Sequence, residues 1–194
     1  VPVLEDFSVD VDTLKNDDAA IVLANPNAPT GRALTRDNIA LLADSNSDRL
    51  VVVDEAYFGF GAETAVPLIA DRDNLLVTRS LSKSHALAGM RVGYAIAQPD
   101  LIEGLIRVKD SFNSYPLDAI AQAAAAAAIQ DTQWLENASQ EVREVREVMS
   151  AGLRTIGFEV LPSQANFIFT EHQSLAGKQI FDALRARDIL VRRW

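Results

Sequence analysis

The sequence predicts an α/β fold: a mostly parallel sheet with helices on both faces, followed by part of a small α+β C-terminal domain. Three observations predict this class. Short, continuous apolar runs are typical of strands buried on both faces, and they occupy residues 19–24, 50–53, 75–78 and 92–97. Stretches with helical periodicity alternate with these runs, as in parallel sheets. After one long amphipathic stretch, the last third changes to short strands around a single helix.

The first half of the chain contains signals for where the predicted strands and helices begin and end. Residues 9–18 are polar and read as a helix or turn that leads into the fold. The run 19–24 ends in NPNAPTG, a dense cluster of turn residues. Thr35 is placed to cap the next helix, which would turn Ile39 and Leu42 toward the sheet.

The second half predicts longer helices. Pro99 opens one helix, and the alanine run 123–128 favours a second, which we expect to be buried. Residues 133–156 predict a long amphipathic helix with its charged face in solvent and Arg143 paired with Glu147 across one turn. Its apolar stripe is Val142, Val145, Met149 and Leu153.

The C-terminal third predicts the small domain. Strands are expected at 158–161 and 165–169, then a helix at 176–187 and the start of a strand at 189–191. We therefore divide the chain into a large domain, residues 1–138, and a linker helix with the start of a small domain, residues 139–194. Val1 is not a methionine, and the chain stops just after the strand-like ILVRR, so we expect an internal portion of a larger protein.

Composition excludes several classes of function. The formal net charge is −9, which argues against binding to nucleic acid or to an anionic membrane surface. No apolar run is long enough to span a bilayer. The chain has no cysteine and only two histidines, so we expect no disulfide frame and no metal site. The first residues lack a signal-peptide pattern, and a cytoplasmic protein is the expectation.

Polar residues follow three of the predicted strands directly. Asn27, Asp54 and Ser80 each come just after an apolar run. Ligands of open α/β sheets bind at the carboxyl ends of the strands, so these side chains are expected to share one crevice.

One stretch in this crevice carries a lysine among groups suited to a phosphate. Ser80, Ser82 and Arg91 offer two hydroxyls and a guanidinium fork. Lys83 lies between them, and it is either another phosphate ligand or an amine held against a phosphorylated carbonyl compound, as in a Schiff base.

Taken together, NPNAPTG, VVVDEAY, SLSK and Arg91 resemble the fold-type-I pyridoxal-phosphate (PLP) enzymes, the aspartate aminotransferase superfamily. Within it, the details are most similar to the histidinol-phosphate aminotransferase family. The resemblance runs over essentially the whole chain.

The resemblance implies PLP as cofactor and gives roles to the crevice residues. Lys83 would bind the cofactor covalently and later move the substrate's α-proton. Asp54 would pair with the pyridine nitrogen, and Tyr57 would donate to the phenolate oxygen. The phosphate would lie on Ser80, Ser82 and Arg91.

The remaining implied contacts are a second ligand of the phenolate oxygen and two substrate residues. Asn27 is the candidate second ligand, although the position that often supplies this asparagine in the superfamily is Ala28 here. Asn166 matches a position near the substrate, and Arg192 matches an arginine that contacts the substrate phosphate.

The resemblance implies transamination between histidinol phosphate and a 2-oxo acid in histidine biosynthesis, by a homodimer. Two relatives with the same cofactor motifs remain open: an aromatic aminotransferase and a threonine-phosphate decarboxylase. A non-enzymatic alternative is the PLP-binding domain of a transcriptional regulator, but no DNA-binding module is evident. A nicotinamide dehydrogenase is excluded because no G-x-G-x-x-G motif follows a strand.

Overall fold

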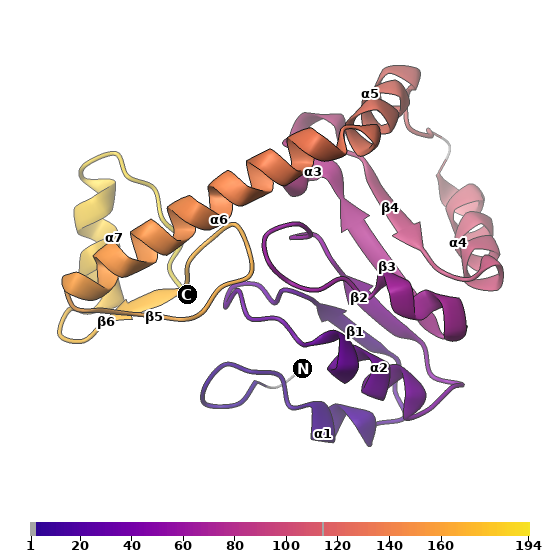
Figure 1. Cartoon of the computed structure of the whole chain (residues 1–194), viewed down its shortest axis with the longest axis horizontal. Coiled ribbons are helices and arrows are strands. Elements are labelled where there is room, and N and C mark those ends of the chain that lie inside the picture. The colour runs from indigo at the N-terminus through magenta and orange to yellow at the C-terminus, as the bar shows by residue number, and fades with distance from the viewer. Residues whose placement is uncertain (1–2, 114) are drawn as a thin grey trace.

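The structure is a computed structural model that describes residues 3–113 and 115–194. Its centre is a four-stranded sheet in the order β1-β2-β3-β4, with β1 parallel to β2, β2 parallel to β3, and β4 antiparallel to β3 (Figure 1). The strands are β1 (Ile21–Ala24), β2 (Val51–Asp54), β3 (Leu75–Ser80) and β4 (Gly93–Ile96). The α/β class with a mostly parallel sheet is confirmed.

The main core lies between one face of the sheet and the helices that pack on that face. Alternate residues of the strands point into it, among them Val51, Val53 and Val77, which are fully enclosed. It is covered by α1 (Val11–Lys15), α2 (Arg36–Asp44) and the 3₁₀ helix η1 (Val66–Asp71). On the opposite face the side chains of β1 are less covered, and Val22 is 66% exposed.

The start of α2 is set by a hydrogen-bonded cap. The Thr35 hydroxyl accepts from the backbone N–H of Asn38 at 3.2 Å, as the sequence predicts. The helix then buries Ile39, Leu42 and Ala43 in the core.

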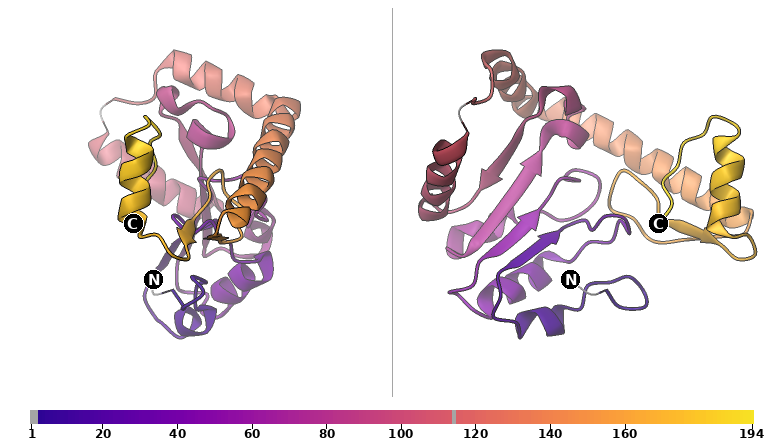
Figure 2. Two further views of the ribbon diagram at one scale, coloured as in Figure 1. Left: turned by 90° about the vertical axis from the view of Figure 1, so that its left-hand side faces the viewer. Right: turned by 180° about the vertical axis from the view of Figure 1, so that it is seen from behind.

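The second half of the chain leaves the sheet along a 24-residue helix. Figures 1 and 2 show α6 running from α5, beside α3, to a two-stranded antiparallel sheet and α7 at its other end. None of the helices in the described ranges is long and apolar enough to cross a membrane. The remaining elements are α3 (Leu81–Ser84), the 3₁₀ helix η2 (Ala88–Met90), α4 (Pro99–Phe112), α5 (Ala119–Gln130), α6 (Thr132–Thr155), β5 (Phe158–Val160), β6 (Thr170–His172) and α7 (Gly177–Arg185).

The alanine-rich helix α5 forms, but the prediction that it is buried is wrong for most of its surface. Only Ala121 and Ala125, one turn apart, are buried, and they pack on Leu81 and Val92. Ile120, on another face, is 74% exposed. Small side chains permit close packing on any face of a helix, but here only one narrow stripe meets a neighbour.

The face of α6 that contacts the protein matches the predicted apolar stripe only in part, since Val142 and Leu153 are half-buried. Val145 and Met149 are exposed, whereas Ser139 and Ser150 are buried. Arg143 turns inward with this face and donates to the carbonyl of Gly59 at 2.8 Å instead of pairing with Glu147. Backbone carbonyls from distant loops thus select which side of the helix faces inward.

Two strand predictions in the C-terminal third are also wrong. In place of the predicted strand 165–169, residues 164–167 form a bend, because the Ser163 hydroxyl accepts from Ala165 N–H at 3.1 Å and donates to the Phe167 carbonyl at 2.7 Å. The second strand is β6 instead. Residues 189–194 have no regular structure and are exposed, so no strand carries Arg192.

The core between α2 and the sheet should be the most sensitive to truncation. Leu42 is 0% exposed, so Leu42→Ala should lower the free energy of unfolding by about 2–5 kcal/mol through lost burial and the cavity left behind. Its neighbour Leu41 is 45% exposed and serves as the matched control. Urea denaturation of the intact protein measures both, and an equal loss in the two variants would contradict this packing.

Candidate functional site

Asp54 ends β2, and its carboxylate is held in place by its neighbours. Its Oδ1 accepts from the Ala56 N–H at 3.0 Å and from the Thr78 hydroxyl at 3.2 Å. Thr78 is also its register partner on β3. Both bonds use Oδ1, so Oδ2 keeps its capacity to accept a hydrogen bond from a ligand.

Glu55, the next residue, belongs to the other side of the sheet and is 2% exposed. Its carboxylate accepts from Arg79 at 2.9 Å, from the Thr64 hydroxyl at 2.9 Å and from the Ala65 N–H at 2.6 Å. The Arg79 guanidinium also lies 3.6 Å from the centre of the Phe58 ring. This enclosed ion pair joins the ends of β2 and β3 behind Asp54.

The lysine lies in a short connection between antiparallel strands. Ser80 pairs with Gly93 at the end of the β3–β4 ladder, and Leu81 N–H donates to the Val92 carbonyl at 3.1 Å. The connection thus begins and ends at adjacent points. It carries Ser82, Lys83 and Arg91.

Within this connection the predicted phosphate ligands sit on tightly bent backbone. The Ser80 hydroxyl accepts from Ser82 N–H at 3.1 Å and caps α3. Arg91 has a left-handed backbone, with φ of 55°, which is uncommon for a residue with a side chain. A Cβ at Gly93 would lie 3.1 Å from the Arg79 carbonyl, so glycine allows the strands to approach closely there.

Tyr57 follows Asp54 in the loop between β2 and η1. Its ring packs edge-to-face against Phe167, with 5.0 Å between the ring centres. Asn166, the candidate substrate residue, is exposed and directly precedes Phe167. The structure therefore brings the Tyr57 loop together with the segment that carries Asn166.

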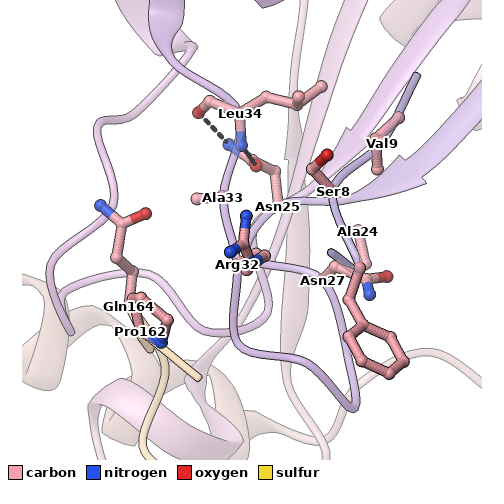
Figure 3. A pocket seen from close by; sticks show the side chains of 11 residues that line it. Ser8, Val9, Ala24, Asn25, Asn27, Arg32, Ala33, Leu34, Pro162 and Gln164 are labelled. Atoms are coloured by element: carbon pink, nitrogen blue, oxygen red, sulfur yellow. Dashed lines mark hydrogen bonds between the residues drawn. The ribbon is translucent and has the colours of Figure 1, made fainter. Parts of the chain in front are cut away.

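Asn27 is engaged within its own turn. Its side-chain amide donates to the Thr30 hydroxyl at 2.9 Å. Its side chain also lines a cavity of about 220 Å³ beside Arg32 and Gln164 (Figure 3). The role of Asn27 as a cofactor ligand stays a prediction; its side-chain amide has two N–H donors, and one of them is engaged by Thr30.

Arg192 lies in the exposed C-terminal segment, where its guanidinium stacks 5.8 Å from the Trp194 ring centre. Its proposed contact with a substrate phosphate stays a prediction.

Sequence reasoning missed Thr78 and Arg79 as supports of the site. Both lie on β3, just ahead of Ser80, and alternate along the strand: Thr78 bonds Asp54 and Arg79 bonds Glu55. A hydroxyl and a guanidinium at the polar end of an apolar strand were the available signal.

His85 is a buried histidine two residues after Lys83. Its Nδ1 lies 2.9 Å from the Ser84 hydroxyl. Burial, and to a smaller extent the nearby positive charge of Arg79, hold the pKa of His85 below its usual 6.5. The imidazole is therefore neutral at physiological pH.

The class of protein follows from a match to one family over the full length of the chain. Residues 1–194 match the model of the family "Aminotransferase class I and II", and the chain belongs to this family.

The chain also has high sequence identity to individual members of the family. The chain is 55% identical over 192 residues to a histidinol-phosphate aminotransferase of Gluconacetobacter diazotrophicus, which covers 99% of this chain and 54% of that protein. It thus spans about half the length of the curated relatives it matches.

Solved structures agree with the fold. The histidinol-phosphate aminotransferase of Sinorhizobium meliloti, in complex with pyridoxal-5'-phosphate, superposes with a TM-score of 0.85 at 25% identity, covering 100% of this chain and 54% of that one. The L-threonine-O-3-phosphate decarboxylase of Porphyromonas gingivalis has a TM-score of 0.71 at 26% identity, covering 92% of this chain and 58% of that one.

The lowered pKa of His85 predicts a loss of stability in acid. Below pH 6.5 the unfolded chain takes up a proton at this position that the folded protein resists, so the free energy of unfolding falls as pH drops toward the folded pKa. His85→Gln removes this proton uptake. Urea denaturation at pH 7.5 and pH 5.5 should therefore show a smaller acid loss in the variant than in wild type. An identical pH dependence in the two proteins would show that His85 titrates normally.

Proposed function

We propose that this protein is a PLP-dependent aminotransferase that acts on histidinol phosphate and 2-oxoglutarate in histidine biosynthesis. The observation that carries the proposal is the joint placement of Asp54, with a free carboxylate oxygen, and the closed Ser80–Gly93 connection that holds Lys83. Asp54 ends β2 and the connection follows the end of the neighbouring strand β3, in a chain whose relatives include histidinol-phosphate aminotransferases.

The residues present fit PLP. The cofactor needs an anionic partner for its ring nitrogen, an amine for its aldehyde and several donors for its phosphate. Asp54 is held through one oxygen, and the exposed Lys83 side chain forms no ion pair with any residue in the described ranges. Ser80, Ser82 and Arg91 supply the phosphate donors. When bound, PLP provides a ring that draws electrons away from the substrate's α-carbon.

Asp54 and Lys83 have complementary tasks in this scheme. The Asp54 carboxylate holds a proton on the ring nitrogen by its charge, and Thr78 and Ala56 fix the direction of its Oδ1. The Lys83 amine would bind the cofactor's aldehyde and would also move the substrate's α-proton. Tyr57 donates its hydroxyl to the phenolate oxygen.

Histidinol phosphate as amino donor rests on the relatives and on the arginine at position 192. A second candidate, decarboxylation of threonine phosphate, is favoured by one observation, the likeness to the P. gingivalis decarboxylase. The identity to the G. diazotrophicus aminotransferase is twice as high and covers more of the chain, which favours the first. Arg192, by its match to the histidinol-phosphate aminotransferases, and Asn166 are the proposed substrate contacts.

Assembly and location belong to the same proposal. A homodimer in the cytoplasm, with small-molecule substrates and neither nucleic acid nor membrane as partner, follows from the family resemblance. The division into a large domain, 1–138, and a linker with the start of a small domain, 139–194, has the same basis.

Borohydride reduction of the cofactor-loaded intact protein tests the proposed function directly. Reduction should fix the cofactor irreversibly on Lys83, and peptide mapping by mass spectrometry locates the label. Lys83→Ala should abolish both label and transamination, while Lys109→Ala, a change at an exposed lysine on α4, should leave both unchanged. A label on another lysine, or none, overturns the assignment.

Arg192 tests the choice of substrate. Arg192→Ala should lower kcat/KM on histidinol phosphate by a factor equivalent to roughly 2–4 kcal/mol of transition-state stabilisation. The reason is that a charged hydrogen-bond partner of the phosphate is lost. Phenylalanine, which lacks a phosphate, should be affected little. The neighbouring Arg193→Ala is the matched control. Equal losses on both substrates would show that Arg192 does not read the phosphate.

A further inference from the structure

Arg146 is a largely enclosed arginine in the middle of α6, with a side chain only 10% exposed. Its Nη1 donates to two backbone carbonyls at once, that of Phe60 at 2.8 Å and that of Ala165 at 2.8 Å. The first belongs to the loop that carries Tyr57, and the second directly precedes Asn166. One guanidinium therefore joins the two segments that flank the candidate site from opposite halves of the chain.

The loop around Phe60 packs closely against α6 because glycine at position 59 leaves room for the helix. Gly59 has a left-handed φ of 97°, and a Cβ there would lie 2.9 Å from the Ser139 hydroxyl. Arg143, one turn before Arg146, donates to the Gly59 carbonyl at 2.8 Å. The loop is thus bonded to α6 at two successive carbonyls.

The segment around Ala165 is fixed just as closely. Ala165 is fully buried, and Gln164 donates from its side chain to the Gly61 carbonyl at 3.2 Å and from its backbone to the Gly31 carbonyl at 2.8 Å. Beyond Asn166, the Phe167 ring rests against Tyr57. Arg146 contacts the backbone of these two segments, and its polar atoms form no hydrogen bond with Tyr57 or Asn166.

We propose that Arg146 is a positioning residue for Tyr57 and Asn166 in the candidate site. By holding the carbonyls of Phe60 and Ala165 with one planar group, it sets Tyr57 and Asn166 at a fixed separation. The inference rests on the proposed function for the roles of those two residues. The two N–H groups of Nη1 point in directions fixed by the planar guanidinium, whereas the donors of a lysine ammonium rotate freely on a flexible stem and are not fixed toward two carbonyls.

The chain provides a matched control. Arg143 bonds the same loop from the same face of α6 but makes no bond to residues 163–167. Arg143→Gln should loosen the Tyr57 loop alone, whereas Arg146→Gln should loosen both segments. Arg146→Lys keeps the charge and one bond, and it covers the case in which the glutamine variant does not fold.

The first measurement needs neither cofactor nor activity. Hydrogen exchange of the cofactor-free intact protein should be faster at residues 57–61 and at residues 163–167 in Arg146→Gln and Arg146→Lys. In Arg143→Gln it should be faster only at residues 57–61. If exchange at residues 163–167 stays at its wild-type rate in both Arg146 variants, the proposal that Arg146 holds the two segments together is refuted.

The second measurement uses steady-state kinetics with histidinol phosphate. Both Arg146 variants should raise KM about tenfold or more with a smaller change in kcat. The reason is that residues 57–61 and 163–167 are displaced while Lys83 and Asp54 are not. A wild-type KM in both variants, or the same KM change in Arg143→Gln, overturns the proposal. Absence of transamination by the wild-type protein would instead refute the proposed function. The exchange data would still show whether Arg146 holds the two segments together.

Discussion

The buried ion pair between Glu55 and Arg79 is the constraint on which the candidate site depends. Each partner is the chain neighbour of a site residue: Glu55 follows Asp54, and Arg79 precedes Ser80. Because the Glu55 carboxylate is enclosed and also bonded by Thr64 and Ala65, removing Arg79 would leave a charge without its counterion in the core. The ends of β2 and β3 are thereby locked to one register, and strand alternation directs Asp54 away from the pair.

Much of this arrangement could be predicted from local patterns. The apolar runs predicted the four strands, and the hydroxyl of Thr35 predicted the start of α2. These features depend on residues close together in the chain. The convergence of Asp54 and Ser80 at one edge followed from the general rule for parallel strands.

What could not be predicted depends on long-range contacts. A helical projection places Arg143 and Arg146 on a charged surface, and only the carbonyls of distant loops show why they face inward. Likewise, the alanines of α5 fit any neighbour, so their sequence does not reveal how many faces are covered. The bend at residues 163–167 was missed because one hydroxyl, that of Ser163, outcompetes a strand pattern of apolar residues.

The antiparallel direction of β4 has a bearing on how this sheet assembles. Ser80 and Gly93 pair across a far shorter stretch of chain than Ile21 and Val51, which must close a loop that contains all of α2. Loop-closure entropy grows with the length enclosed, so the β3–β4 pairing is the least costly in the sheet to form. The segment that carries Lys83 is therefore defined by contacts that the nascent chain can make locally, before its parallel neighbours are in place.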